Sequence, residues 1–199
     1  MLYNCPAVQS LLHFVRWRLG FDAAEHWMDA DEAACLLGHA ARKSRLAEIG
    51  VWEGGTTRRI RALMAPGATL FAIDPYAPGR LGVSYQRLIA HGEVSRVTNG
   101  TVIWLRETGA AAARRAEVAA APFDFVFVDG DHTYDGLRHD WEGWAPLIAS
   151  GGVIALHDSL LPEGHADAGS VRYSNEVVVR DPRFEVVDEV MSLRVLRRR

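Results

Sequence analysis

Residues 46–56 read LAEIGVWEGGT, and this stretch decides the fold of the chain. Its first residues form a short apolar run with Glu48 inside it, which is typical of a buried strand, and Gly50 follows where the strand ends. Gly54 and Gly55 come next, where the backbone must pass close to a ligand or a neighbouring strand. A helix is expected to follow, with Thr56 or Thr57 as its N-cap and with Ile60, Leu63 and Met64 at helical spacing.

A strand, glycine turn and helix of this kind often bind the adenosine part of a cofactor. The dinucleotide fingerprint would place glycines at positions 50, 52 and 55, but here Trp52 and Glu53 follow the first glycine. The indole blocks the approach of a pyrophosphate, and the carboxylate competes with phosphate for the positive end of the helix dipole. A cofactor with adenosine and no phosphate fits better, which indicates S-adenosylmethionine.

The rest of the chain alternates between strand and helix patterns. Strands are expected at 69–76, 101–105, 122–129, 151–159, 184–190 and 192–196, and helices at 83–92, 107–121, 171–180 and after 134. Two helices precede them, one within 1–20 with Leu11, Leu12, Val15 and Leu19 on one side, and one from Asp29 or Asp31 to Ala41 with Ala34, Leu37 and Ala41 inward. We therefore predict an α/β fold, a Rossmann-like doubly wound sheet of about seven strands, mostly parallel with an antiparallel C-terminal hairpin and with helices on both faces. Residues 1–199 would form one domain, with a helical segment at 1–42 and the cofactor-binding core at 43–199.

Composition restricts the class of protein further. The 199 residues carry a net charge of -3, which gives no basic face for nucleic acid. Cys5 and Cys35 make neither a disulfide framework nor a zinc motif, so both are expected to be inert thiols. No signal peptide and no apolar run of the ~20 residues that cross a membrane is present, which predicts a cytoplasmic protein. Lys43 is the only lysine, and this points to a GC-rich bacterial genome.

Polar residues end several of the expected strands, where ligands bind in a doubly wound sheet. Asp74 ends the second strand, 20 residues after Gly54, a spacing that suits an acid on the ribose hydroxyls. Tyr76 is either an adenine contact or a surface aromatic, and Glu107 or Thr108 falls where adenine contacts are expected. The fourth and fifth strands end in Asp129–His132 (DGDH) and in His157, Asp158 and Ser159. The residues predicted to contact the cofactor are Glu48, Gly50, Trp52, Gly54, Thr56, Asp74, Tyr76, Glu107 and Asp129.

The segment Glu48–Thr57, EIGVWEGGTT, resembles motif I of the class I S-adenosylmethionine-dependent methyltransferases. It is especially similar to the small-molecule O-methyltransferase branch, which includes macrolide-sugar methyltransferases and cephalosporin hydroxylase-like proteins. The resemblance runs from about Trp27 to the C-terminus. It implies a metal-binding Asp at Asp129 and further ligands at the pair His157-Asp158 or Asp158-Ser159, with Mg²⁺ as the metal. Relatives more often carry Asp-Asp, Glu-Asp or Asp-Asn at that pair, and histidine is a poor Mg²⁺ ligand.

The same resemblance implies a catalytic base at His132, because sugar O-methyltransferases carry Asp-x-x-His at this place. His132 could instead bond backbone in the turn, Asp131 could contact the cofactor or cap the helix, and His157 is the base if no metal binds. The predicted catalytic residues are His132, Asp129 and Asp158, and the predicted metal ligands are Asp129, His157 and Asp158.

The sequence thus predicts methyl transfer from S-adenosylmethionine to a hydroxyl of a small molecule, a sugar or other natural-product intermediate. Acceptor specificity is expected from residues 1–20 and from 159–173, which include a loop at 160–169. Two alternatives stay open: a cofactor-binding protein with different chemistry, and a non-catalytic partner subunit. The N-terminal helix could pack on the domain, cover the site or join two copies in a homo-oligomer.

Overall fold

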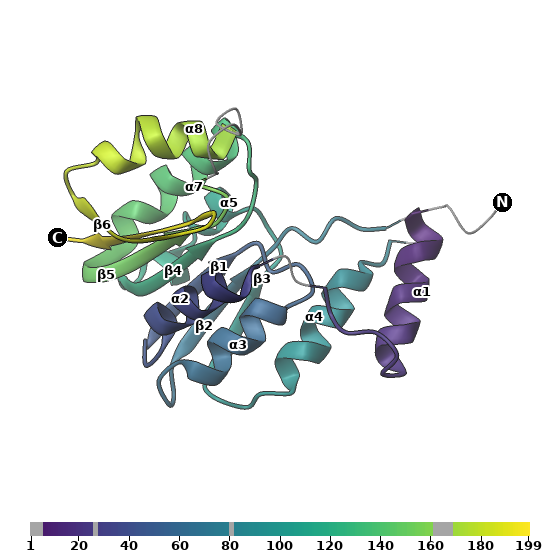
Figure 1. The fold of residues 1–199 in the computed structure, drawn as a ribbon. Helices are drawn as coiled ribbons and strands as arrows, with labels where there is room; N and C mark the ends of the chain where they lie inside the picture. The colour runs from purple at the N-terminus through teal and green to yellow at the C-terminus, as the bar shows by residue number, and fades with distance from the viewer. Residues whose placement is uncertain (1–5, 26–27, 80–81, 161–168) are drawn as a thin grey trace.

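A seven-stranded sheet, in the order β3-β2-β1-β4-β5-β7-β6, runs through the described part of the computed structural model (Figure 1). The structure describes residues 6–25, 28–79, 82–160 and 169–199, with side chains from residue 9 onward. The first five strands are parallel, β7 is antiparallel to β5, and β6 is antiparallel to β7. The strands are β1 (Arg45–Ile49), β2 (Thr69–Ile73), β3 (Thr101–Leu105), β4 (Phe123–Val128), β5 (Ile148–Leu156), β6 (Phe184–Val190) and β7 (Leu193–Arg198). The predicted fold class is confirmed.

Helices cover both faces of this sheet (Figure 1). They are α1 (Pro6–Arg18), α2 (Ala30–Ala40), α3 (Gly55–Leu63), α4 (Tyr85–Ser95), α5 (Gly109–Ala112), α6 (Ala116–Ala119), α7 (Tyr134–Trp144) and α8 (Gly169–Glu176), with 3-10 turns at Ala145–Leu147 and Val178–Arg180.

The sheet has a hydrophobic core on each face, and alternate residues of β1 contribute to one core or the other. Leu46 joins the buried cluster under α2 and α3, whereas Ala47 and Ile49 join the cluster under α7.

The position of β1 decides where a ligand can bind. This strand pairs with β2 on one side and β4 on the other, so the chain reverses its direction of travel across the sheet at β1. In open α/β sheets, ligands bind beyond the carboxyl ends of the strands at such a switch point. The LAEIGVWEGGT stretch therefore ends at the place where a site is expected.

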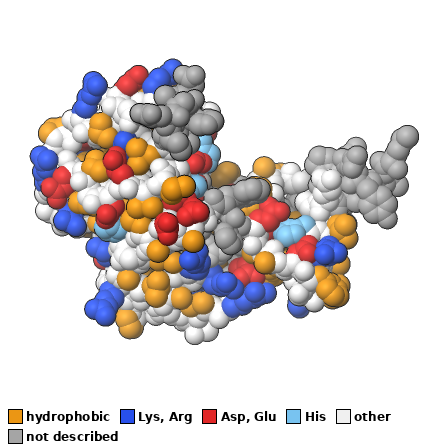
Figure 2. All heavy atoms as spheres, in the orientation of Figure 1, with side chains coloured by type: hydrophobic (Ala, Val, Ile, Leu, Met, Phe, Trp, Pro, Cys, Tyr) orange, Lys and Arg blue, Asp and Glu red, His pale blue; other side chains and the backbone are white. Residues whose placement is uncertain are grey.

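Helix α1 packs on the domain, which is one of the three roles that the sequence left open. Trp17 is buried and its indole donates a hydrogen bond to Glu93 of α4 at 2.7 Å, whereas the side that carries the leucines is exposed. Figure 2 shows hydrophobic side chains at the surface of this helix, and both signs of charge interspersed over the viewed face. The exposed apolar side chains are Leu11, Leu12, Val15 and Leu19. Association of two copies through this side stays a prediction.

Two helix predictions were wrong in detail. Helix α2 buries Glu32, Ala33, Leu36 and Ala40, and its capping box turns the Glu32 carboxylate inward. Of the residues predicted to face inward, Leu37 does pack, partly buried, against the core, whereas Ala34 is exposed and Ala41 is the C-cap. The helix expected at 107–121 is two short helices, α5 and α6, because Arg115 is extended and pairs with Glu107 and Glu117. Most of the loop expected at 160–169 lies outside the described residues.

Helix α7 begins at a hydroxyl cap, which gives a first testable consequence. The Thr133 hydroxyl accepts a hydrogen bond from the Gly136 N–H at 2.9 Å. Thr133→Ala should lower the free energy of unfolding by about 1 kcal/mol because this N–H loses its partner. Urea unfolding checks this, with Thr133→Ser as the control that keeps the hydroxyl and should retain most of the stability. An equal loss in both variants would contradict the capping role.

Within the described residues, no helix is both long enough and apolar enough to cross a membrane.

Candidate active site

The turn after β1 depends on two glycines with left-handed backbone. Gly50 has φ of 87°, and a Cβ placed there would overlap the carbonyl oxygen of Asp129 at the end of β4. Gly54 has φ of 76° and caps α3, and a Cβ there would lie 2.9 Å from the Cα of Ala90. The N-cap of α3 is therefore Gly54 rather than the predicted Thr56 or Thr57, because the left-handed backbone at this position favours glycine.

Asp74 closes the other side of this turn. Its Oδ2 accepts hydrogen bonds from the Val51 and Trp52 N–H groups, both at 3.0 Å, and its Oδ1 accepts one from Tyr76 at 2.7 Å. Trp52 itself has φ of 53°, a strained conformation for a non-glycine residue. A carboxylate has about four lone-pair positions, so Asp74 keeps capacity for a ligand hydroxyl.

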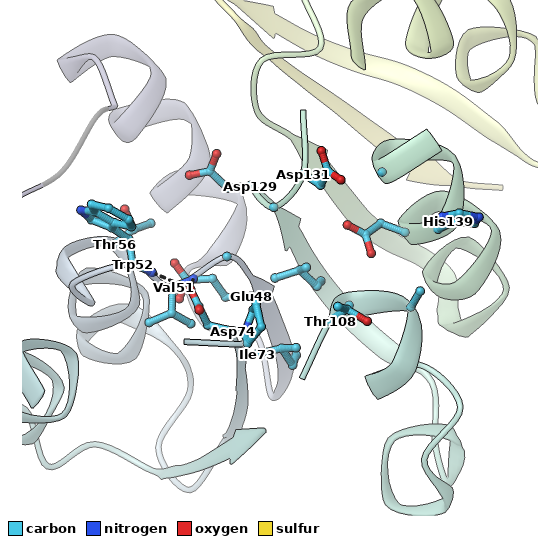
Figure 3. Close-up of a pocket in the computed structure, with 18 of the residues that line it drawn as sticks. Glu48, Val51, Trp52, Thr56, Ile73, Asp74, Thr108, Asp129, Asp131 and His139 are labelled. Carbon is cyan, nitrogen blue, oxygen red and sulfur yellow. Dashed lines mark hydrogen bonds between the residues drawn. The ribbon is translucent and has the colours of Figure 1, made fainter. Parts of the chain in front are cut away.

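A cavity of about 470 Å³ opens beyond the carboxyl ends of β1, β2 and β4. Figure 3 shows Glu48, Val51 and Asp74 on one side and Thr108 and His139 across from them. Of the predicted cofactor residues, Glu48, Gly50, Trp52, Thr56, Asp74 and Asp129 line the cavity, together with Thr108.

Three predicted contacts do not line this cavity. Gly54 lies behind the turn against Ala90, Tyr76 is buried in a small cluster with Val51 and Ala72, and Glu107 pairs with Arg115. Their predicted contact with a cofactor stays a prediction.

Glu48 is the most unusual group in the cavity wall. Its side chain is 1% exposed, and neither carboxylate oxygen has a hydrogen-bond partner among the described residues. Burial raises the pKa of Glu48 to about 8; the nearby Thr57 hydroxyl offsets part of this rise, and the negative charges of Asp129 and Asp74 add to it. An unpaired buried carboxyl is costly, so its place in a cavity wall indicates a ligand group that pairs with it.

Glu48→Gln should therefore stabilise the protein in a pH-dependent way. Because the folded pKa lies above the unfolded value of 4.5, the stability of the wild type is highest below that value and falls as pH rises toward 8. Glutamine does not ionise, so the variant does not lose stability in this way. Its unfolding free energy relative to that of the wild type should be on the order of 3 kcal/mol larger at pH 8 than at pH 5. Urea unfolding at both pH values measures this difference.

Glu93 provides the matched control for this comparison. It is equally buried but paired with Arg58 at 2.8 Å and with Trp17, so Glu93→Gln should destabilise the protein instead. If the gain in unfolding free energy of Glu48→Gln did not change with pH, the claim that Glu48 is buried and protonated would be contradicted.

Beside the cavity, the ends of β4 and β5 bring together four titratable side chains. His157 Nδ1 lies 2.9 Å from Asp129 Oδ1 and 3.7 Å from Asp158 Oδ2. His132, which is half-exposed, lies with Nε2 3.8 Å from Asp129 Oδ1 and Nδ1 3.5 Å from Asp158 Oδ2. The DGDH and HDS segments predicted from the strand ends thus meet, and the His132 ring faces two carboxylates rather than backbone.

His157 is held in its charged form. Burial opposes protonation, but the hydrogen bond to Asp129 and the charges of Asp129, Asp158 and Glu32 raise the pKa of His157 to about 9. Glu32 Oε2 lies 3.4 Å from His157 Nε2, and Glu32 Oε1 accepts hydrogen bonds from Ser192 N–H and hydroxyl groups at 2.7 and 2.6 Å. An imidazolium between three carboxylates results.

Sequence reasoning missed two acidic residues here. Glu32 comes from α2, and its only sequence signal is the spacing of three residues from Asp29 that makes a capping box. Asp140 lines the cavity and lies three residues after Leu137, on the face of α7 that also carries Trp141. Burial and the charge of Asp131 raise the pKa of Asp140 to about 7.

Of the two roles that the sequence left open for Asp131, the helix cap is wrong and the cofactor contact stays a prediction. Its side chain lies in the cavity wall (Figure 3), and its Oδ1 accepts a hydrogen bond from the Thr133 N–H at 2.9 Å. Thr133, and not Asp131, is the N-cap of α7.

Comparison with known proteins identifies the family. Residues 47–159, from the middle of β1 to the residue after Asp158, match the family described as a methyltransferase domain. A curated relative, the uncharacterized protein y4gI of Sinorhizobium fredii, is 28% identical over 174 residues, 81% of this chain. This chain spans 17% of that relative's length.

Solved structures show the same fold. The O-methyltransferase from Bacillus cereus in complex with SAH has a TM-score of 0.62 at 16% identity, with 96% of this chain and 90% of that chain covered. The O-methyltransferase TomG from Streptomyces achromogenes, involved in tomaymycin synthesis and solved with SAM, has a TM-score of 0.61 at 18% identity, with 96% and 89% covered. The matched family covers more than half of the sequence, including the glycine turn and both strand-end clusters, and the chain therefore belongs to the methyltransferase domain family.

Proposed function

We propose that this chain is an S-adenosylmethionine-dependent O-methyltransferase that acts on a hydroxyl of a small molecule, a sugar or natural-product intermediate. The observation that carries the proposal is the cavity wall at the end of β1. There the unpaired Glu48 carboxyl and Asp74 face one cavity, and the cluster of Asp129, His132, His157 and Asp158 adjoins it. Both O-methyltransferases and the N-methyltransferase NodS from Bradyrhizobium japonicum share this fold, so oxygen as the acceptor atom is proposed from the site and not from the fold.

The residues of the cavity fit this cofactor. Asp74 follows β2 and has about one lone-pair position left for a ribose hydroxyl, while the buried Glu48 carboxyl can pair with a cationic amino group. Trp52 lines the cavity at the position where the dinucleotide fingerprint has its second glycine, which disfavours a dinucleotide. Thr108 and His139 lie across the cavity, where the adenine end would be.

When bound, the cofactor supplies an electrophilic methyl group on a sulfonium. The protein must hold the acceptor in line with that methyl group and remove its hydroxyl proton. His132 would take the hydroxyl proton of the acceptor. In the tautomer whose Nδ1–H faces Asp158, the free Nε2 would accept this proton. Asp129 Oδ1, 3.8 Å from Nε2, would then stabilise the imidazolium that forms. His157 is already charged and would hold Asp129 and Asp158 in position.

The predicted Mg²⁺ set does not fit this arrangement. Mg²⁺ prefers oxygen ligands in octahedral geometry, whereas the third predicted ligand is a nitrogen: His157 Nδ1 lies 2.9 Å from Asp129 Oδ1 and 3.7 Å from Asp158 Oδ2. No step of the proposed reaction is routed through a metal.

Calorimetric titration of the purified protein with S-adenosylmethionine, with and without Mg²⁺, tests the proposal. We expect binding in the micromolar range that Mg²⁺ leaves unchanged, and weaker binding by Asp74→Ala because the ribose loses its acceptor. Release of S-adenosylhomocysteine over a panel of sugars and phenols then identifies the acceptor. If the protein bound NAD but not S-adenosylmethionine, the assignment would be overturned. If Mg²⁺ made S-adenosylmethionine binding tighter, a metal would again have to be included in the proposed reaction.

A further inference from the structure

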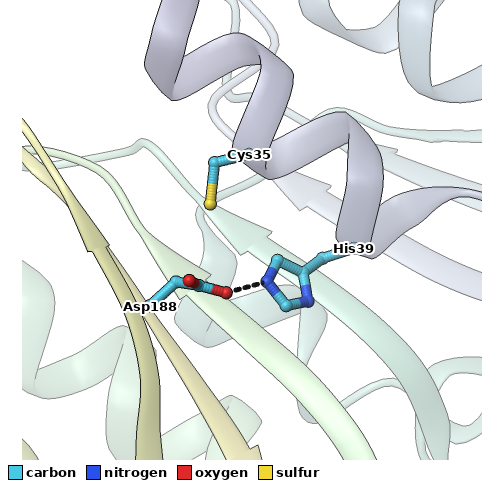
Figure 4. A group of neighbouring side chains, drawn as sticks. All are labelled: Cys35, His39 and Asp188. Carbon is cyan, nitrogen blue, oxygen red and sulfur yellow. Dashed lines mark hydrogen bonds and ion pairs between the residues drawn. The ribbon is translucent and has the colours of Figure 1, made fainter.

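A second cluster of metal-binding side chain types lies between α2 and the edge strand β6, built from residues that do not line the cavity. Cys35 and His39 are four residues apart on α2, so they lie on one face of the helix. Asp188 comes from β6, and its Oδ2 lies 2.6 Å from His39 Nε2 (Figure 4). One ligand atom from each of the three residues lies within 4.8 Å of the other two.

The chemistry of this donor set selects a particular class of cation. A thiolate, an imidazole and a carboxylate together are typical ligands of zinc, whereas Mg²⁺ and Ca²⁺ take oxygen. Metal–ligand distances of roughly 2.0–2.3 Å in a tetrahedron place neighbouring ligand atoms about 3.3–3.7 Å apart, so the observed spacing needs only small side-chain movements. We propose that Cys35, His39 and Asp188 bind Zn²⁺, with water as the fourth ligand.

The backbone of β6 supports this proposal independently. The pairing of β6 with β7 shifts register between Val186 and Asp188, which is a β-bulge. Val187 packs against the hydrophobic cluster under α2, and Asp188 reaches His39 on the same helix. Successive residues of a regular strand point to opposite faces, so the bulge is what turns Asp188 toward α2.

Exposure at the site allows the cation to enter. The Asp188 side chain is 47% exposed and that of His39 20%, while Cys35 is partly buried against the core. Burial and the charge of Asp188 raise the pKa of the Cys35 thiol, so without a metal it stays protonated. Binding would release that proton, since zinc takes the thiolate form.

The same face of α2 connects this site to the β6–β7 turn. Glu32, three residues before Cys35, accepts hydrogen bonds from Ser192 in that turn and faces His157. Zn²⁺ at Cys35, His39 and Asp188 would attach α2 to the edge strand at a second point, one to two helical turns further along. Its expected role is to fix the sheet edge against the helix that supports the active site.

Zinc binding by the full-length, metal-free and untagged protein tests the site directly. Competition with a chromophoric zinc chelator should give one Zn²⁺ per chain, and Co²⁺ should produce a thiolate-to-cobalt charge-transfer band in the near ultraviolet. Cys35→Ser should abolish the band and weaken zinc binding by about 100-fold, with His39→Gln and Asp188→Asn each weakening it by at least about 10-fold. Zinc should also raise the melting temperature of the wild type but not of Cys35→Ser.

Two controls separate this site from other thiols and from general charge. Cys5→Ser and Glu185→Gln, the latter on the same strand as Asp188, should bind zinc as the wild type does. Absence of stoichiometric binding, or equal binding by Cys35→Ser, would overturn the proposal. Calorimetric titration with S-adenosylmethionine is a separate readout, so a failure of the proposed function would not be mistaken for a failure of this site.

Discussion

Gly50→Ala should abolish cofactor binding and lower the free energy of unfolding by about 3 kcal/mol or more. The alanine Cβ would overlap the Asp129 carbonyl oxygen and lie 3.1 Å from the Gly130 nitrogen, and both neighbours are backbone atoms that cannot rotate away. The residue would also carry a φ of 87°, which costs about 1 kcal/mol without any clash. Relief of the overlap requires β1 and β4 to separate where their ends form the cavity wall.

A second glycine separates the effect of the clash with Asp129 from the effect of the positive φ. Gly67 has a φ of 77°, and a Cβ there meets nothing within 4 Å. Gly67→Ala should therefore lose only about 1 kcal/mol and keep cofactor binding. Urea unfolding and calorimetric titration of both variants make the comparison. Equal losses in the two would mean that backbone strain, and not the close approach of Gly50 to Asp129, sets the requirement for glycine.

The sequence predicted correctly which residues lie near one another where their position follows directly from the strands. Glu48, Gly50, Asp74, Asp129 and the two histidines follow or lie within parallel strands, and such strands end at one edge of the sheet. No knowledge of side-chain packing is needed to bring them together. This is why strand order and residue type were sufficient to place these residues near each other.

The sequence could not predict which face of a helix turns inward, nor which residues far apart in the chain come into contact. Alanine is so frequent in α2 that several faces look equally apolar, and only the buried Glu32 decides which one turns inward. The role of Glu32 depends in turn on Ser192, 160 residues away. The sequence spacing of Cys35 and His39 does not indicate a zinc site either, because the third proposed ligand, Asp188, lies 149 residues beyond His39.

The metal prediction rests on family resemblance, and it stays a prediction. It placed ligands at Asp129, His157 and Asp158, and the strand ends do bring these three side chains together. Without a metal, the two carboxylates raise the pKa of His157, so a protonated imidazole balances their charge in this arrangement.

His132→Gln should lower kcat by about 10²- to 10³-fold while cofactor affinity stays within about twofold, because general-base catalysis typically contributes factors of this size. Its side chain is 46% exposed and is not part of the cavity wall, so the fold and the cofactor site should tolerate the change. Glutamine keeps a polar group between Asp129 and Asp158 but cannot accept the acceptor proton. The loss should therefore appear in kcat rather than in binding.

Added imidazole distinguishes a lost base from a lost structure. A small base can enter the space left by the ring near the exposed mouth of the cluster, so it should restore part of the turnover of His132→Gln in proportion to its concentration. Wild-type turnover should not respond. Full activity of the variant would mean that His132 is not the base. Loss of cofactor binding without rescue would assign His132 a structural role between Asp129 and Asp158, and the base would then have to be sought elsewhere in the cluster.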